Sequence, residues 1–294
     1  MSSIQLASAL ISGVVNGALY SLLGLAIVLI FRTTAVANFA QGDIGMLGAF
    51  VLIMFIVPLG LPLWGAWIVT VCLSGIFGGL IYLCLLKPRP IAGHLNLTIR
   101  TLGLSTLAYA VALYVWGEGE PYRVPSLFPR LTTELMGFSI SYDQIGTVAV
   151  ALVLSIILLA FFRFTQIGLA MRAVAINPDI ARLQGVNVNR IVLVVWIVAA
   201  GIGAAVGLLI APISFLETAL MRPYLLKAFT AAIMGGLYSF PGVLLGGVIL
   251  GITESLAAMW LSVQLREAFV FLVLLLVLLL RPAGIFGHII RTRV

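Results

Sequence analysis

Long apolar stretches recur along the chain, and they leave few ways for it to fold. Two of them, 144–162 and 191–213, are each long enough to cross a bilayer as a helix rising about 1.5 Å per residue. Hydrophobic residues make up 63% of the 294 residues and charged residues 9%, unlike a soluble domain. Because backbone polar groups must all be paired inside a bilayer, these stretches indicate helices. The sequence therefore predicts an all-α, polytopic integral membrane protein.

The apolar stretches together predict about eight to ten membrane-spanning helices in a single transmembrane domain over residues 1–294. The segment 224–239 is short for a full crossing, and whether it crosses or re-enters decides the side on which one end of the chain lies. The expected spans are 8–31, 44–58, 64–86, 100–116, 144–162, 191–213, 224–239, 241–260 and 268–280.

The polar loop 164–190 lies between two of these stretches. It carries Arg172, Arg182 and Arg190 against one acidic residue, Asp179. An excess of Lys and Arg in a short loop is typical of the cytoplasmic side, so we expect this loop in the cytoplasm.

The other ends and loops follow from the same charge rule. Arg281, Arg291 and Arg293 place the C-terminus in the cytoplasm, whereas the side of the N-terminus stays open. The loop 117–142 carries mixed charge and is expected on the external face.

A short helix is expected inside the cytoplasmic loop. Asn177 can cap its N-terminus, Pro178 suits its first position, and Gly185 can end it in a left-handed conformation. A helix this short is marginal alone in water, and Ile180 and Leu183 share one face of it. We therefore expect it to dock, either on the membrane domain itself or on another protein.

Polar residues interrupt the apolar sequence at 33–43. Asn38, Gln41, Gly42 and Asp43 lie there at membrane level, where exposed polar backbone is not tolerated. Two interpretations stay open: a pathway or gate element, and a helix-capping turn at the cytoplasmic interface.

Other polar or small residues within the apolar stretches also have two interpretations. Glu254 is a functional candidate as an intramembrane carboxylate, but it can also form a structural pair with Lys227 or Arg266. The candidates for helix packing or for the substrate path are Thr101, Ser105, Gly235 and Gly236.

Several functions are not expected. The basic residues lie in loops and at helix ends, so membrane lipid is an expected partner and nucleic acid is not. The sequence lacks G-x-x-x-x-G-K-[ST], H-E-x-x-H and G-x-S-x-G, so we expect neither ATP hydrolysis nor another enzyme activity. His94 and His288 lack metal-ligand spacing, and we expect the chain to bind no metal or cofactor.

Four stretches that follow one another along most of the chain carry a resemblance. They are GLAIVLIFRTTAVANFAQGDIGMLGAF at 24–50, IGLAMRAVAINPDIARLQGVNVNRI at 167–191, KAFTAAIMGGLYSFPGVLLGGVILGITES at 227–255 and RPAGIFG at 281–287. With them the chain resembles the branched-chain amino acid (Liv-type) ABC transporter permease family, in particular its shorter permease subunit.

The resemblance implies a multi-subunit importer in the bacterial cytoplasmic (inner) membrane. Its expected partners are a second permease subunit, two ABC ATPase subunits that bind ATP and Mg, and an external solute-binding protein. Family members import branched-chain and other apolar amino acids, and related ones take urea, amides or aromatic acids. The resemblance therefore leaves the solute open.

The resemblance also implies a contact with the ATPase. The ABC coupling-loop pattern Glu-Ala-Ala-x-x-x-Gly is met here by Asp179-Ile180-Ala181-x-x-x-Gly185. The residues expected to couple to the ATPase are Gly168, Arg172, Ala173, Asn177, Pro178, Asp179, Ile180, Ala181, Leu183 and Gly185. The expected substrate path comprises Asn38, Gln41, Gly42, Asp43, Thr101, Ser105, Gly235, Gly236 and Glu254.

The chain differs from the family's usual sequence at one motif, and one other class of transporter is an alternative. Where family members commonly show N-F-A-H-G-E, this chain has Gln41 and Asp43, so any role of that His does not carry over. The rival is a stand-alone ion-coupled secondary transporter or channel, which needs buried acidic or His residues, and the sequence offers only Glu254 clearly.

Overall fold

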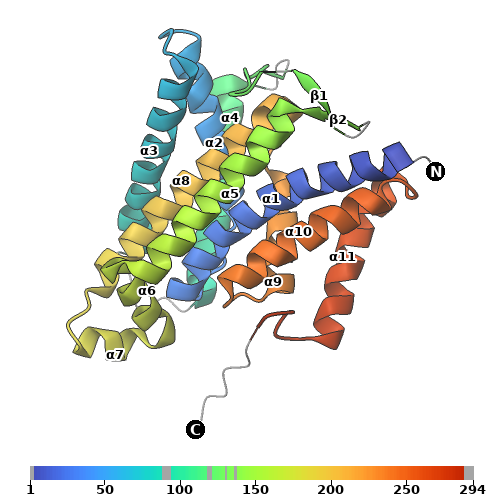
Figure 1. Cartoon of the computed structure of the whole chain (residues 1–294). Coiled ribbons are helices and arrows are strands. Elements are labelled where there is room, and N and C mark those ends of the chain that lie inside the picture. Colours follow the sequence, from blue (N-terminus) through green and yellow to red (C-terminus); the bar gives the residue numbers. More distant parts are fainter. Residues whose placement is uncertain (1–2, 88–93, 118–120, 130, 136–137, 288–294) are drawn as a thin grey trace. The chain divides into compact units, whose positions relative to one another are not determined.

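A computed structural model describes residues 3–87, 94–117, 121–129, 131–135 and 138–287, and these are nearly all helical (Figure 1). The helices are α1 (Ser3–Thr34), α2 (Gln41–Ile56), α3 (Leu63–Ile81), the π-helix η1 (Tyr82–Leu86), α4 (His94–Trp116), α5 (Tyr142–Phe164), α6 (Gln166–Ile176), α7 (Pro178–Leu183), α8 (Val188–Ser214), α9 (Arg222–Gly235), α10 (Phe240–Ala257) and α11 (Val263–Leu280). The predicted all-α, polytopic class is confirmed.

Each predicted span corresponds to a helix. Among the described residues, six helices are long and apolar enough to cross a membrane, namely α1, α3 with η1, α4, α5, α8 and α10. By contrast, α2 has 16 residues and α9 has 14, so each is shorter than the roughly 20 residues that a full crossing needs. The total number of crossings therefore stays a prediction.

The predicted external loop contains a structure that the sequence did not suggest. A two-stranded antiparallel hairpin forms from β1 (Thr132–Leu135) and β2 (Phe138–Ser141). Its register pairs Thr132 with Ser141 and Leu135 with Phe138. Strands this short carry little periodic signal, which explains why prolines and mixed charge alone had indicated a loop.

The described helices group into two compact units. The first comprises residues 1–28, 128–153 and 226–294, and the second comprises 29–127 and 154–225. Because α1, α5 and α9 each contribute to both units, no single point of the chain divides them. The prediction of one domain over 1–294 stays a prediction.

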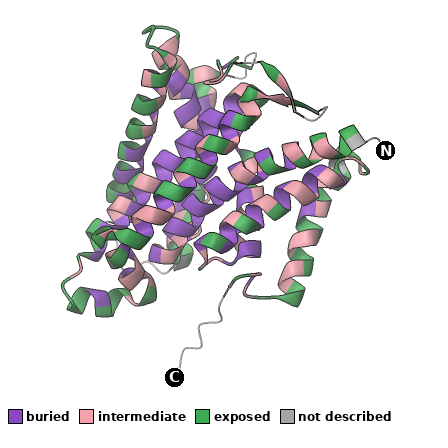
Figure 2. Ribbon diagram, viewed as in Figure 1, coloured by how far each residue is buried: buried purple, intermediate pink, exposed green. Residues whose placement is uncertain are grey.

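In the second unit, α8 packs against α2 and α3. Most of α8 is buried, whereas much of α3 is exposed (Figure 2). Many of the exposed residues of α3 are large and apolar, as in a lipid-facing helix.

In the first unit, α1 crosses α10 at backbone distance. A Cβ at Gly251 would overlap the backbone of Gly13 and Gly17, and Ser21 Oγ donates a hydrogen bond of 2.8 Å to the carbonyl of Leu244. Small residues at this crossing let the two helices approach closely. Helices in a membrane associate mainly through van der Waals packing and hydrogen bonds, and close approach strengthens both.

Candidate transport and coupling sites

The short helix α7 begins as the sequence predicts. Asn177 Oδ1 accepts hydrogen bonds from the backbone N–H groups of Asp179 and Ile180, each at 3.0 Å. Pro178 occupies the first helical position, where its missing N–H costs nothing. Two of the N–H groups that a helix start leaves unpaired are thus satisfied by one side chain, and the predicted cap is confirmed.

The end of α7 is also closed by local bonds. Gly185 has a φ of +85°, in the left-handed region. Its N–H donates to the carbonyl of Arg182 at 3.0 Å, and the N–H of Val186 donates to the carbonyl of Ala181 at 3.0 Å. This pair of bonds is a Schellman motif, in which glycine is favoured because it lacks a Cβ. The predicted left-handed terminus is confirmed.

The two sides of α7 differ in exposure. Ala181 is only 2% exposed, and α7 contacts α6 and α8. Ile180 is 53% exposed and Leu183 is 88% exposed, while Asp179 and Arg182 form an exposed ion pair at 3.1 Å. The sequence leaves open whether this helix docks on the membrane domain itself or on another protein. The described helices of this chain do not cover Ile180 and Leu183.

The helix α6 holds the other predicted coupling residues. Gly168 donates its N–H to Thr165 Oγ1 at 3.0 Å, and a Cβ at 168 would overlap the carbonyl oxygens at the end of α5. Gly168 therefore serves the tight turn between α5 and α6. Arg172 lies 3.5 Å from the carbonyl of Arg163, at the same turn, and Ala173 is partly exposed. A contact of these three residues with an ATPase stays a prediction.

The polar break before α2 lies inside the second unit. Gln41 Nε2 donates to the carbonyl of Ala199, near the middle of α8, at 2.6 Å. Asn38 Nδ2 donates to Gln41 Oε1 at 3.0 Å, and Asn38 Oδ1 accepts the N–H of Ala40 at 3.1 Å. Both side chains are fully buried. The break thus has a feature of each interpretation. It lies beside the middle of α8, as a pathway or gate element would, but its polar side chains are hydrogen-bonded within the chain, as in a structural turn.

Two polar residues of α4 meet this break. Thr101 Oγ1 accepts the N–H of Phe39 at 3.3 Å and lies 3.1 Å from the carbonyl of Ala37. The Ser105 hydroxyl donates to the carboxylate of Asp43, which lies in the first turn of α2, where negative charge is favoured. The structure thus brings Thr101 and Ser105 together with the residues of the break.

The neighbourhood of this cluster adds an arginine that the sequence interpretation did not include. The Arg222 guanidinium lies 4.1 Å from the centre of the Tyr109 ring, one turn beyond Ser105 on α4. The predicted path residue Gly42 faces the side chains of Leu225 and Met221. The residues in these contacts lie far apart in the sequence, so no local sequence pattern predicts them.

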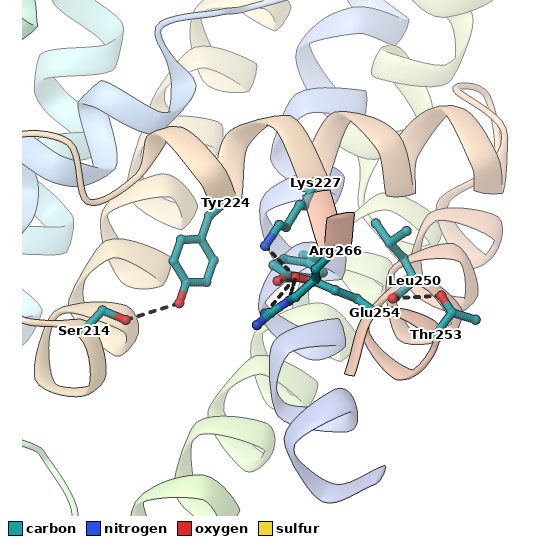
Figure 3. Close-up of polar contacts among 8 residues, drawn as sticks. Ser214, Tyr224, Lys227, Leu250, Thr253, Glu254 and Arg266 are labelled. Carbon is teal, nitrogen blue, oxygen red and sulfur yellow. Dashed lines mark hydrogen bonds and ion pairs between the residues drawn. The ribbon is translucent and has the colours of Figure 1, made fainter. Parts of the chain in front are cut away.

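The second polar cluster surrounds Glu254, which is 1% exposed (Figure 3). Its Oε1 accepts hydrogen bonds from Lys227 Nζ at 2.6 Å and from Arg266 Nε at 2.9 Å, and Arg266 Nη2 lies 2.8 Å from the same oxygen in an ion pair. Its Oε2 accepts from the hydroxyl of Tyr20 at 2.8 Å. Both partners proposed from the sequence are therefore present, and Tyr20 is a third that no local pattern indicated.

The two predicted path glycines are the last residue of α9, Gly235, and the residue that follows it, Gly236. Gly235 packs against the backbone of Gly242, and Gly236 has a φ of +101° next to Gly284. These contacts agree with the packing interpretation, and a role in a substrate path stays a prediction. Within the described residues, no group of three or more His, Cys, Asp or Glu side chains is placed to hold a metal ion.

Long apolar helices with polar clusters buried among them define a multi-pass membrane protein. Residues 9–278 match the family described as "Branched-chain amino acid transport system / permease component". The chain belongs to this family, which confirms the resemblance and the prediction of a transport subunit.

Relatives of known name match along nearly the whole chain. The permease protein LivH of the high-affinity branched-chain amino acid transport system of Salmonella typhimurium is 28% identical, over 94% of both chains. The corresponding protein BraD of Pseudomonas aeruginosa is 29% identical, over 95% of both. A probable branched-chain amino acid transport permease protein LivH of Methanocaldococcus jannaschii is 29% identical, over 90% of this chain and 88% of its own. PsaBC from Streptococcus pneumoniae, solved in complex with Fab, aligns with a TM-score of 0.47 at 18% identity, over 94% of this chain and 90% of that one.

Proposed function

We propose that the chain is the permease subunit of an ATP-driven ABC importer for branched-chain or other apolar amino acids, set in the bacterial inner membrane with its C-terminus in the cytoplasm. The family and the names of the LivH and BraD relatives support the transport class and the solute. Of the basic C-terminal residues behind the orientation, Arg291 and Arg293 lie outside the described residues.

The importer has further subunits in this proposal. A second permease subunit, two ATPase subunits and an external solute-binding protein complete it, and ATP and Mg bind to the ATPases. The observation that carries the proposal is α7, which is capped at both ends yet leaves Ile180 and Leu183 exposed. Exposed apolar side chains on a polar loop mark a surface that a protein covers.

The closed ends of α7 suit it to transmit force. A helix held by Asn177 and Gly185 moves as a unit, and its buried Ala181 faces the packed side towards α6 and α8. An ATPase that docks more tightly in one nucleotide state than in another then biases the arrangement of these helices by the difference in docking free energy.

The rival of another class, an ion-coupled secondary transporter, is disfavoured by the pairing of Glu254. A coupling carboxylate must be free to exchange its ion, but both oxygens of Glu254 are held by Lys227, Arg266 and Tyr20. An importer for urea, amides or aromatic acids remains the alternative within the family.

The proposal is tested by co-purifying and reconstituting the chain with its ATPases and binding protein. L-leucine uptake that depends on ATP is expected, and Leu183→Asp is expected to abolish both ATPase association and uptake, because it places a charge in an apolar contact. The matched variant Leu183→Met keeps the apolar contact and should retain both. Transport by the purified chain alone without ATP, or full association of Leu183→Asp with the ATPases, would contradict the proposal.

A further inference from the structure

The cluster around Glu254 contains two cations and one anion. Lys227 and Arg266 both bind the same oxygen, Oε1, and among the described residues their ion pairs are with Glu254 alone. Glu254 lies in the apolar helix α10, one of the candidate membrane spans. The cluster therefore carries one more positive than negative charge near the end of this helix, and a second anion would balance it.

Both cations keep hydrogen-bond donors that Glu254 does not use. A lysine ammonium has three N–H donors, and one of Lys227 is directed at Oε1. A guanidinium has five, and those of Arg266 that reach Oε1 belong to Nε and Nη2, so both N–H groups of Nη1 remain. The remaining donors of the two side chains suffice to hold a carboxylate.

The two cations are also more exposed to solvent than the carboxylate that they bind. The side chain of Glu254 is 1% exposed, whereas Lys227 is 15% exposed and Arg266 is 34% exposed. A ligand that approaches the cluster therefore meets the two cations and not the carboxylate that holds them. Lys227 is further fixed by the Tyr20 ring, whose centre lies 5.6 Å from Nζ.

From this arrangement we propose that Lys227 and Arg266 bind the carboxylate group of the transported amino acid, while Glu254 and Tyr20 position the two cations. The inference rests on the proposed function, because it takes an amino acid as the solute. Binding is through charged hydrogen bonds, for which the planar guanidinium is well suited. In this proposal the two cations recognise the solute by its carboxylate.

The first experiment measures L-leucine uptake by the complete importer, reconstituted in phosphatidylcholine vesicles with ATP and saturating loaded binding protein. The neutral lipid supplies no anionic headgroup to compete for the cations. Arg266→Met and Lys227→Met are each expected to lower the initial rate about tenfold or more, because each removes a charged hydrogen-bond donor. Arg281→Met removes an exposed cation from the other end of α11 and should leave the rate unchanged.

The second experiment needs no variant, so it stands even if a substitution impairs folding. Tritiated L-leucine is bound to the wild-type permease–ATPase complex without its binding protein, and two analogues compete. We expect 4-methylpentanoate, which keeps the carboxylate, to displace leucine, and 3-methylbutan-1-amine, which lacks it, to fail. Displacement by the amine but not by the acid, or no leucine binding at all, would overturn the inference.

The two proposals fail in different ways. If the wild-type importer takes up no amino acid, the proposed function is wrong. If it takes up leucine and well-folded Arg266→Met does so at the wild-type rate, only the carboxylate site is wrong.

Discussion

The carboxamide nitrogen of Gln41 lies 2.6 Å from the carbonyl oxygen of Ala199. This bond fixes the start of α2 to the middle of α8, and a second bond from Asn38 to Gln41 Oε1 extends it to the preceding break. Both polar side chains are fully buried, so water does not replace either bond. The first turn of α2 is therefore hydrogen-bonded to the buried part of α8.

Replacing Gln41 with Leu should lower the thermal stability of the detergent-purified protein. The change leaves the buried amide of Asn38 without its acceptor, at a cost of about 1–3 kcal/mol. The exposed Gln184 provides the control, and Gln184→Leu should melt at the wild-type temperature. Equal melting temperatures for the two variants would show that the buried bond contributes nothing.

The crossing of α1 and α10 predicts a glycine that tolerates no side chain. Gly251→Ala should destabilise the protein strongly, because its Cβ would overlap the backbone of Gly13 and Gly17, which cannot move aside as a flexible side chain can. Gly103 in α4 is the matched control, since a Cβ there has no atom within 4 Å. Gly103→Ala should be neutral or stabilising by up to about 1 kcal/mol through helix propensity. The melting temperatures of the two variants test this, and similar values would contradict the close contact.

Local chemistry explains what the sequence could predict. The cap at Asn177 and the left-handed Gly185 bond to residues within a few positions, so short patterns suffice to find them. By contrast, Tyr20 and Glu254 are 234 positions apart, and Gln41 and Ala199 are 158 apart. No helical period relates such pairs, so candidate residues for the polar clusters could be predicted from the sequence, but which of them meet could not.

The left-handed residue at the end of α7 gives a prediction for coupling. Gly185→Val should penalise this terminus by roughly 1–2 kcal/mol, because a β-branched residue is strained at positive φ. Under the proposed function, the variant should recover less ATPase on co-purification and show less substrate-stimulated ATP hydrolysis. Gly185→Asn is the control, since Asn tolerates this conformation. ATPase recovery at the wild-type level with Gly185→Val would count against docking on α7.

The charge balance around Glu254 predicts that substitutions in this cluster destabilise the protein to different extents. Glu254→Gln should be the most destabilising single change, by about 3–5 kcal/mol, because it leaves two cations without an anion. Lys227→Met should cost less, since Arg266 and Tyr20 still bind the carboxylate.

Replacing Glu254, Lys227 and Arg266 together with Met should recover much of the loss, because a buried ionic cluster is often no more stable than apolar residues of similar size. Thermal unfolding of the purified variants measures the order. A triple variant as unstable as Glu254→Gln would mean that the two unpaired cations are not what destabilises Glu254→Gln. Recovery of stability without recovery of leucine uptake would separate the two roles, because the apolar variant keeps the packing of α9, α10 and α11 but has no donor for a carboxylate.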